Sequence, residues 1–265
     1  MTTLVRHVIE WIEGAVGLAE NTVDGLKFGR PDMTVTGIAV AFTASQSVVE
    51  AALRAGANLL ISHEGEFYAH RDRVETLEGD DLVVLEKRGL IAQSGLALYR
   101  CHDALHYRQP DEIIQGLVRR LGWEAYLRED LQVAVILEMP ETTVGELAEH
   151  CKRALGLPYL RVAGDLAMKC TRIGLSAGYR GGGELCIPMF REHDLDMIIT
   201  GEGPEWETPE YVRDAMRQGR KKALILLGHA ESEQPGMQLL AESLKRAFPA
   251  TPIQFIAEEP VFRIV

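Results

Sequence analysis

The sequence contains few cysteines, and none of them forms a Cys-x-x-Cys pair. The four cysteines, Cys101, Cys151, Cys170 and Cys186, are widely spaced along 265 residues. This spacing excludes a zinc knuckle and a thioredoxin-like redox motif, because both need closely paired thiols. We therefore expect four buried free thiols that behave as small apolar side chains. Cys101 directly precedes His102 and could contact a functional site, although a core-facing position at a strand end is the preferred interpretation.

Long hydrophobic runs are also missing. No apolar stretch approaches the ~20 residues that a helix needs to cross a bilayer. The N-terminus has no basic region followed by an apolar stretch and a small-residue cleavage site, which is the pattern of a secretory signal. The sequence therefore predicts a cytoplasmic protein that has no membrane partner.

Basic residues are outnumbered by acidic ones. The chain has 28 Lys and Arg against 39 Asp and Glu, so its formal net charge is -11. This charge opposes non-specific attraction to a phosphate backbone, and we expect no nucleic-acid partner. Hydrophobic residues make up 46% of the chain, which is enough to fill a substantial core.

Several nucleotide-binding and catalytic motifs are absent. The glycine-rich stretch 177–183 lacks the Lys-Ser/Thr of a P-loop and the spacing of a Rossmann fingerprint. No Gly-x-Ser-x-Gly elbow indicates a serine hydrolase. A turn of this composition ahead of a helix can still bind an anion through backbone N–H groups, but a purely structural turn is the favoured interpretation.

Short apolar runs alternate with amphipathic segments along the whole chain, which predicts an α/β fold built from βαβ units with parallel strands. The expected strands are 36–42, 58–62, 96–101, 131–137, 171–178, 196–200, 223–227 and 252–257. The expected helices are 7–14 with Trp11 and Ile12 facing inward, 45–56, 81–89, 111–121, 143–155, 183–193 and 209–218. Residues 24–31 are expected to form a turn-rich link.

The order of these elements repeats weakly, so we expect two similar, interlinked α/β domains that comprise residues 1–128 and 129–265. A C-terminal segment may return to pack on the first half. In each half, one strand is followed by a Glu-Gly pair, at Glu64 or at Glu202. The next strand is followed by a histidine, His102 or His229, with a second possible ligand four residues later. These side chains follow strand ends, where an α/β sheet exposes polar groups to a crevice.

Imidazoles and carboxylates in these positions predict a metal site. The candidate ligands are His63, Glu64, His106, His229 and Glu233. Three imidazoles and two carboxylates, with no thiolate, suit zinc, iron or manganese. Five ligands are too many for one closed tetrahedral site, but they suit two divalent ions that share a bridging carboxylate and a water.

Each part of this set has a structural alternative. His102 and His106 could form a surface pair at the start of a helix, and His229 could lie in a simple turn. His102 and Asp103 are secondary ligand candidates beside His106, whose spacing from His102 equals that of Glu233 from His229. The remaining histidines His70, His150 and His193 are expected at the surface.

The motifs together resemble the Ngg-interacting-factor-three-like family, which is often labelled GTP cyclohydrolase type-2 homologues. The resemblance covers nearly the whole chain. It rests on Ile61-Ser-His63-Glu64, His102-Asp-Ala-Leu-His106, Ile199-Thr-Gly-Glu202 and Gly228-His229-Ala-Glu-Ser-Glu233. The family has a second histidine where this chain has Glu64 and an aspartate where it has His106, so two ligand types are exchanged and their totals are unchanged. A third departure follows Glu202. The family often has a lysine and an aromatic-histidine pair there, whereas this chain has Gly-Pro-Glu-Trp-Glu207.

The resemblance implies two α/β domains, two divalent ions in the cleft between them, and a homo-oligomer, commonly a ring-shaped hexamer. The expected function is a metal-dependent hydrolase that acts on a small polar or phosphorylated molecule, with Glu233 or Glu202 handling protons. The alternative is a non-catalytic metal-handling or regulatory protein, and a third possibility is an interaction scaffold. The cyclohydrolase label has little support from the residues, because that chemistry relies on a thiolate-bound zinc.

Overall fold

The structure, a computed structural model, describes residues 2–14, 16–71, 81–263 and 265. The chain divides into two compact units. Unit 1 comprises Met1–Arg108 and Met237–Glu258, and unit 2 comprises Gln109–Gly236 and Glu259–Val265. Each unit contains its own sheet, which confirms the α/β fold class predicted from the sequence. The division that the sequence suggested, after residue 128, lies farther along the chain than the Arg108 boundary seen here.

The sheet of unit 1 has the strand order β1-β4-β3-β2-β11. Its strands are β1 (Gly25–Phe28), β2 (Ile38–Ala41), β3 (Leu59–Ser62), β4 (Ala97–Arg100) and β11 (Ile253–Phe255). β2, β3, β4 and β11 run parallel, whereas β1 pairs with β4 in the antiparallel direction. All four residues of β2, β3 and β4 are buried, as expected for parallel strands covered on both faces.

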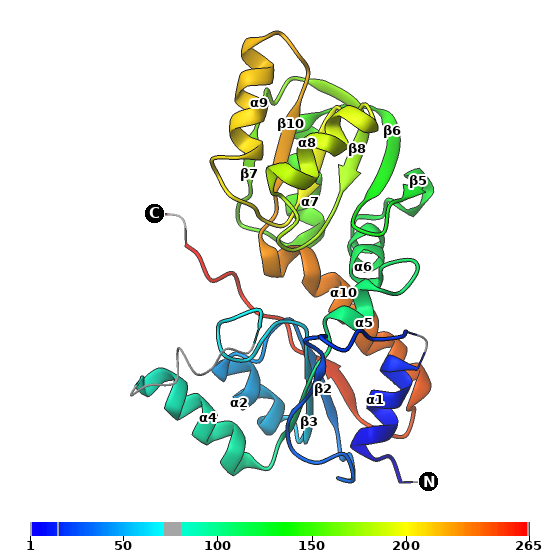
Figure 1. Cartoon of the computed structure of the whole chain (residues 1–265), viewed down its shortest axis with the longest axis vertical. Coiled ribbons are helices and arrows are strands. Elements are labelled where there is room, and N and C mark those ends of the chain that lie inside the picture. Colours follow the sequence, from blue (N-terminus) through cyan, green and yellow to red (C-terminus); the bar gives the residue numbers. More distant parts are fainter. Residues whose placement is uncertain (1, 15, 72–80, 264) are drawn as a thin grey trace. The chain divides into compact units, whose positions relative to one another are not determined.

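Helices cover both faces of this sheet (Figure 1). They are α1 (Val5–Glu13), α2 (Gln46–Arg54), α4 (Leu82–Ser94) and the C-terminal part of α10 (His229–Ala247). The short α5 (Asp103–His106) follows β4 at the carboxyl end of the sheet. α2 and α4 pack against one face, where Val48, Ile91 and Leu60 belong to one apolar cluster. α1 and α10 lie on the opposite face.

The sheet of unit 2 has the strand order β5-β6-β8-β9-β10-β7. Its strands are β5 (Leu127–Asp130), β6 (Val135–Thr143), β7 (Arg161–Ala163), β8 (Lys169–Leu175), β9 (Met197–Thr200) and β10 (Ala223–Leu226). β8, β9 and β10 are parallel, and the strands outside them pair in the antiparallel direction.

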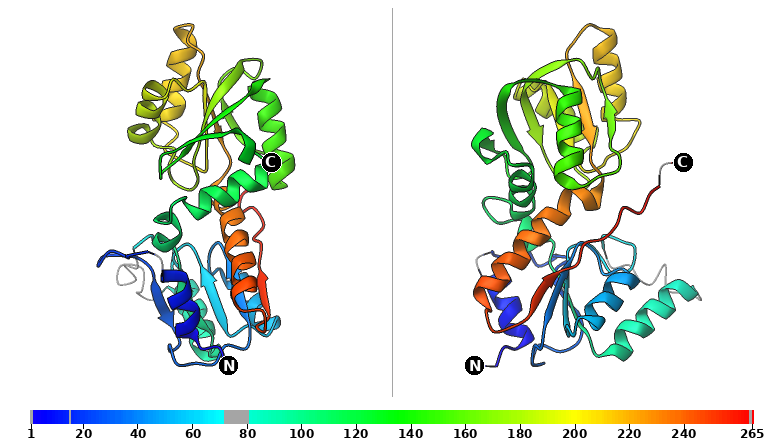
Figure 2. Two further views of the ribbon diagram at one scale, coloured as in Figure 1. Left: turned by 90° about the vertical axis from the view of Figure 1, so that its right-hand side faces the viewer. Right: turned by 180° about the vertical axis from the view of Figure 1, so that it is seen from behind.

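The helices of unit 2 also lie on both faces of their sheet (Figure 2). They are α6 (Glu112–Leu121), the 3-10 turn η1 (Glu124–Tyr126), α7 (Val144–Leu155), α8 (Gly183–Glu192), α9 (Thr208–Arg217) and the first part of α10. α8 and α9 bury Phe190 and Val212 in one apolar cluster with Ile198 of β9. α7 lies on the other face.

The two units repeat one supersecondary pattern. The order β2-α2-β3-α4-β4 in unit 1 corresponds to β8-α8-β9-α9-β10 in unit 2. In both sheets the last of these strands also pairs with an antiparallel strand, β1 in unit 1 and β7 in unit 2. The weak sequence repeat therefore reflects a repeated α/β arrangement.

Helix ends follow the capping residues that the sequence offers. The Ser45 hydroxyl accepts a hydrogen bond from the Val48 N–H, and the Asp111 carboxylate accepts bonds from the first turn of α6. Thr143 caps α7 in a capping box with Glu146. These side chains satisfy N–H groups that have no partner within the helix. Gly122 ends α6 in the left-handed region, where glycine adds no steric cost.

Several local expectations were wrong. Trp11 is 38% exposed, whereas its neighbour Ile12 is fully buried. The expected link 24–31 contains β1, which forms an edge of the sheet. α4 continues through Gly89 to Ser94 because Gly95, in the left-handed region, provides its C-cap. β5 and β7 also lie outside the expected strands.

The thiols behave as the sequence suggested. All four cysteines are free and buried. Burial raises the pKa of Cys151 to about 12 and that of Cys186 to about 11. These side chains are protonated at neutral pH and serve as apolar packing groups. Among the described residues, no helix is both long and apolar enough to cross a membrane.

Candidate metal site

In unit 1, the candidate ligands follow the carboxyl ends of two neighbouring parallel strands. β3 ends at Ser62 and is followed by His63 and Glu64, while β4 ends at Arg100, two residues before His102. Ser62 and Arg100 are paired in the sheet register, so the residues after them leave the sheet at one edge. The N–H groups of His63 and Glu64 both donate to the carbonyl of Phe42, which fixes the loop after β3 to the end of β2.

Three imidazoles meet at this edge. One ring nitrogen from each of His63, His102 and His106 lies within 4.8 Å of the others. His63 and His102 stack with centroids 4.5 Å apart, and the His106 ring meets both nearly edge-on at 5.0 and 4.8 Å. His63 is fully buried and His106 is 7% exposed. The alternative of a surface pair at 102 and 106 is therefore wrong.

The contacts of His63 select its tautomer. Its Nδ1 lies 3.0 Å from the backbone carbonyl of Cys101, which can only accept a hydrogen bond. In the neutral ring, Nδ1 therefore carries the proton and Nε2 has the lone pair. Metal-ligating histidines usually donate the proton of their other ring nitrogen to an acceptor in this way.

His102 is arranged in the same way, with a carboxylate as its acceptor. Its Nδ1 lies 2.9 Å from Oδ1 of Asp103. Burial lowers the pKa of His102 to about 4, and this effect outweighs the adjacent Asp103 carboxylate, which acts in the opposite direction. The hydrogen bond from His102 holds the pKa of Asp103 well below its usual range. The imidazole is therefore neutral and the carboxylate ionised at neutral pH, as metal binding requires.

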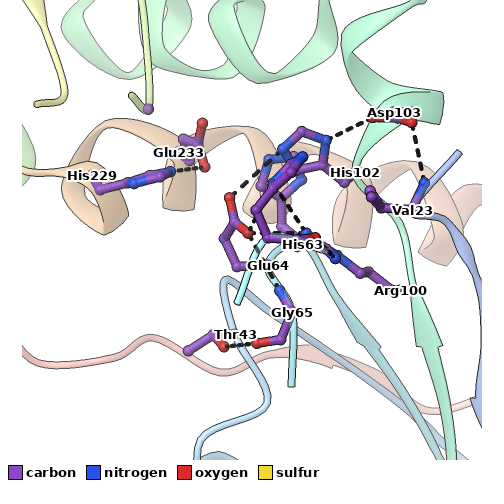
Figure 3. A network of polar contacts seen from close by, with 12 residues as sticks. Val23, Thr43, His63, Glu64, Gly65, Arg100, His102, Asp103, His229 and Glu233 are labelled. Carbon is purple, nitrogen blue, oxygen red and sulfur yellow. Dashed lines mark hydrogen bonds and ion pairs between the residues drawn. The ribbon is translucent and has the colours of Figure 1, made fainter. Parts of the chain in front are cut away.

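Glu64 lies beside this group and is held by a buried cation (Figure 3). Its Oε2 accepts a hydrogen bond from Nη2 of Arg100 at 3.1 Å, and Arg100 is fully buried. Its Oε1 lies 3.6 Å from Nε2 of His102. Glu64, His102 and His70 form a second group that could hold a metal ion. His70 itself is exposed, as the sequence predicted.

In unit 2, the corresponding strand ends bring together His229, Glu233 and Glu202. His229 is the first residue of α10, so Glu233 lies one helical turn farther on. Nδ1 of His229 lies 2.9 Å from Oε1 of Glu202, and its Nε2 lies 3.2 Å from Oε2 of Glu233. A carboxylate oxygen therefore lies beside each ring nitrogen of His229. The Glu202 contact on Nδ1 resembles the contacts on Nδ1 of His63 and His102.

Close packing in unit 2 fixes the Glu233 carboxylate, which is 2% exposed. A Cβ on Gly178 would lie only 2.1 Å from Oε1 of Glu233, and Gly178 has a φ of +63°. The Ser232 hydroxyl accepts a hydrogen bond from the Gly178 N–H and donates one to the carbonyl of His229. Only glycine fits at position 178 without displacing the carboxylate.

The glycine-rich turn before α8 is bound to a carboxylate of the chain itself. The N–H of Gly183 donates to Oε2 of Glu207 at 2.7 Å. Arg180 of the same turn pairs with Asp111 at 3.1 Å. An acidic side chain at a helix N-terminus takes the position that an anionic ligand would use. These contacts favour the structural interpretation of residues 177–183.

Within each unit, the structure brings together ligand candidates that the sequence predicted, although their relative positions differ from those expected. His102 was a secondary candidate, yet it lies between His63 and His106 and beside Glu64. Asp103, the other secondary candidate, contacts Nδ1 of His102, on the opposite side of the ring from Nε2. The role of the buried Arg100 was missed. An arginine at the end of an otherwise apolar strand was the available signal, since such a residue is rarely buried without an anionic partner.

A family profile and individual relatives all relate this chain to the same family. The profile of the family described as Duf34/NIF3 (NGG1p interacting factor 3) matches residues 5–260. A protein of Pseudomonas aeruginosa is 27% identical over 262 residues, which cover 94% of this chain and 93% of that protein. A Clostridium perfringens protein is 24% identical over 244 residues, covering 89% and 87%. Both are named GTP cyclohydrolase 1 type 2 homolog.

Solved structures of similar proteins agree in fold. The crystal structure of a Bacillus cereus protein related to NIF3 superposes with a TM-score of 0.76 at 15% identity, covering 100% of this chain and 99% of the other. The profile match extends over almost the full length, from the first helix to the residues after β11. The chain therefore belongs to the Duf34/NIF3 family.

Proposed function

We propose that this protein binds divalent metal ions and uses them to hydrolyse a small polar or phosphorylated molecule. The observation that carries the metal-binding part is the three-imidazole group of unit 1, His63, His102 and His106. Two of its rings have an acceptor on Nδ1, which places the lone pair of the neutral ring on Nε2. Buried imidazoles that serve only as packing groups have no need for this common orientation.

The proposed metal ligands form two groups for two divalent ions, one group in each unit. Unit 1 would contribute the three imidazoles and Glu64, and unit 2 would contribute His229 and Glu233. The repeat supports this proposal, because each unit presents a histidine and a carboxylate after equivalent strands. Glu64 in unit 1 and Glu233 in unit 2 would each supply negative charge to a divalent ion.

The donor set restricts the choice of metal. Imidazole nitrogen and carboxylate oxygen suit zinc, iron or manganese. The ligand groups found among the described residues contain no cysteine. These groups therefore give no support to a thiolate-bound zinc of the kind on which cyclohydrolase chemistry relies.

When bound, two such ions lower the pKa of water and stabilise the charge that develops on a leaving oxygen. The side chains of the protein would orient the ligands and move protons. Glu202 holds His229 through Nδ1, and its side chain is 42% exposed. This exposure allows Glu202 to exchange a proton with solvent, whereas the buried Glu233 is better suited to hold an ion.

Metal-dependent turnover tests the hydrolase proposal. The metal-free protein would be reloaded with zinc, iron or manganese and assayed against a panel of phosphomonoesters, phosphodiesters and nucleotides. We expect turnover that requires metal and falls by at least about 100-fold in Glu233→Gln. A matched control is Glu149→Gln, because Glu149 is exposed and pairs with Lys152 three residues away. Full activity in Glu233→Gln would contradict the proposal.

A second function, non-catalytic metal handling, is favoured by one observation. His63 is fully buried, and Glu64 is paired with Arg100, so part of the ligand set is engaged by protein groups. A protein that stores or delivers metal needs ligands without a substrate pocket. Stoichiometric metal that exchanges readily, together with no turnover on the whole panel, would support this function instead.

A further inference from the structure

The Asp103 carboxylate is bound on both of its oxygens. Oδ1 lies 2.9 Å from Nδ1 of His102. Oδ2 accepts hydrogen bonds from the Thr22 hydroxyl at 2.8 Å and from the Val23 N–H at 3.3 Å. The carboxylate is therefore fixed between the loop before β1 and the imidazole, and only 17% of its side chain is exposed.

The same loop also fixes the backbone on which His102 stands. One oxygen of Asp24 accepts hydrogen bonds from the N–H groups of His102 and Asp103 at 2.7 and 2.8 Å. The other oxygen accepts one from Ala104 at 2.8 Å. These bonds satisfy the free N–H groups at the start of the short helix α5. Residues 22–24 thus bind both the main chain of residues 102–104 and the Asp103 side chain that contacts His102.

We propose that Asp103 is a positioning residue, which holds the His102 ring so that Nε2 faces the metal site and which strengthens this nitrogen as a ligand. A carboxylate that accepts the Nδ1 proton fixes the tautomer and raises the basicity of Nε2. Low exposure reduces screening by water, so the effect of the negative charge on the ring is larger than at the surface. This inference rests on the proposed metal-binding function.

The other unit supports the inference through an equivalent contact. His229 has Glu202 on its Nδ1, as His102 has Asp103. In both units, the histidine that follows the last strand of the repeat is therefore oriented by a carboxylate. The two differ in their surroundings, because Glu202 is 42% exposed whereas Asp103 is 17% exposed. We therefore expect Asp103 to affect the ring of His102 more strongly than Glu202 affects the ring of His229.

Zinc affinity and the tautomer of His102 test the role of Asp103. The full-length protein would be freed of metal and titrated with zinc in competition with a chromophoric chelator. Long-range nitrogen–proton NMR on the metal-free protein would report which ring nitrogen carries the proton, with the His102 signals identified by their loss in His102→Gln. Three variants would be compared with wild type: Asp103→Ala, Asp103→Asn and Thr22→Val. Asp32→Ala is the control, because Asp32 is an exposed carboxylate of the same unit that pairs with Arg30.

We expect Asp103→Ala to weaken zinc binding by roughly 10- to 100-fold and to shift the His102 proton towards Nε2. Asp103→Asn and Thr22→Val should weaken zinc binding less, because an acceptor remains on Nδ1 in both. Asp32→Ala should change neither property. The proposal is overturned if Asp103→Ala binds zinc as tightly as wild type, or if affinity falls while the tautomer of His102 stays the same. Wild-type protein that binds no zinc, iron or manganese would instead remove the proposed function, and the role of Asp103 with it.

Discussion

Burial and hydrogen bonding set the protonation of the candidate ligands one residue at a time. His102 shows this most clearly, since burial keeps its ring neutral although the Asp103 carboxylate is only 2.9 Å away. A neutral imidazole beside an ionised carboxylate is ready to accept a metal ion without first losing a proton. The same pairing has a consequence for the stability of the metal-free protein.

The low pKa of His102 predicts a loss of stability in acid. The pKa is about 4 in the folded chain, below the ordinary histidine value of 6.5, so unfolding takes up a proton when the pH lies between these two values. This contribution to the free energy of unfolding is fully present above pH 6.5 and is lost as the pH falls to about 4. Its maximum is about 3 kcal/mol.

Urea unfolding of metal-free wild type and His102→Gln at several pH values measures this effect. Other carboxylates titrate in both proteins, so the difference between the two profiles isolates His102. We expect the stability of wild type to fall more steeply than that of His102→Gln from pH 6.5 to 4. Parallel profiles would contradict the assignment of a low pKa to His102.

At the level of elements, local patterns predicted the βαβ units well. Ser45, Asp111 and Thr143 begin their helices as side-chain caps, and Gly122 ends α6. Such signals act within a few residues, so they can be read without knowing the rest of the fold. The predicted strands of the parallel repeat were equally clear, because fully buried strands are continuous apolar runs.

The elements that were missed depend on distant partners. β5 and β7 have largely exposed or half-buried residues and pair antiparallel at the two edges of the unit 2 sheet. β1 lies in a stretch rich in glycine and pairs with β4, far along the chain. The positions of Asp24 and Arg100 beside the candidate ligands also depend on contacts with distant segments of the chain. Neither could be predicted from spacing, because each contact joins segments that only the tertiary fold brings together.

The turn after β8 gives a prediction about the unit 2 ligands. Gly178→Ala would place a Cβ 2.1 Å from Oε1 of Glu233 and should displace that carboxylate. We expect metal bound through His229 and Glu233 to be lost. Gly56→Ala is the matched control, because Gly56 also has a left-handed φ, +75°, and nothing lies within 4 Å of its added Cβ.

Gly56→Ala should lower stability by about 1 kcal/mol through backbone strain and leave metal content unchanged. Metal content and the denaturation midpoint would be measured for both variants. An equal metal content in Gly178→Ala and Gly56→Ala would show that position 178 does not control Glu233.

Within unit 2, two helices approach each other through glycines. A Cβ on Gly236 of α10 would lie 2.5 Å from Cα of Ile113 in α6, and one on Gly116 would lie 2.4 Å from Cα of Gly236. Gly236→Ala should therefore force the helices apart and cost about 1–3 kcal/mol. Gly89→Ala in α4 is the contrasting variant, since its Cβ meets only the Gln93 side chain at 3.7 Å.

Gly89→Ala should raise stability by about 0.5–1 kcal/mol, because alanine is favoured over glycine in a helix interior. Chemical denaturation followed by circular dichroism compares the two variants directly. Opposite signs are expected, and destabilisation of similar size in both would argue against the close contact of α6 with α10.

At the scale of the whole molecule, a repeated α/β unit places candidate metal ligands after equivalent strands in each copy. Unit 1 has three imidazoles with Glu64, and unit 2 has His229 with Glu233. The repeat explains why the sequence alone placed these residues at equivalent strand ends. The exchange of residue types at Glu64 and His106, relative to the family pattern that the sequence resembles, leaves the number of imidazoles in unit 1 unchanged, because both positions belong to that unit.

The metal content of the natively purified protein tests the central claim most directly. Elemental analysis should find about two divalent ions per chain in wild type. His229→Ala combined with Glu233→Ala should reduce this to about one ion, because the three imidazoles of unit 1 remain. The separate double variant His63→Ala with His102→Ala should lose the ion that the imidazoles of unit 1 bind. Wild-type protein without bound metal, or unchanged metal content in both double variants, would contradict the account.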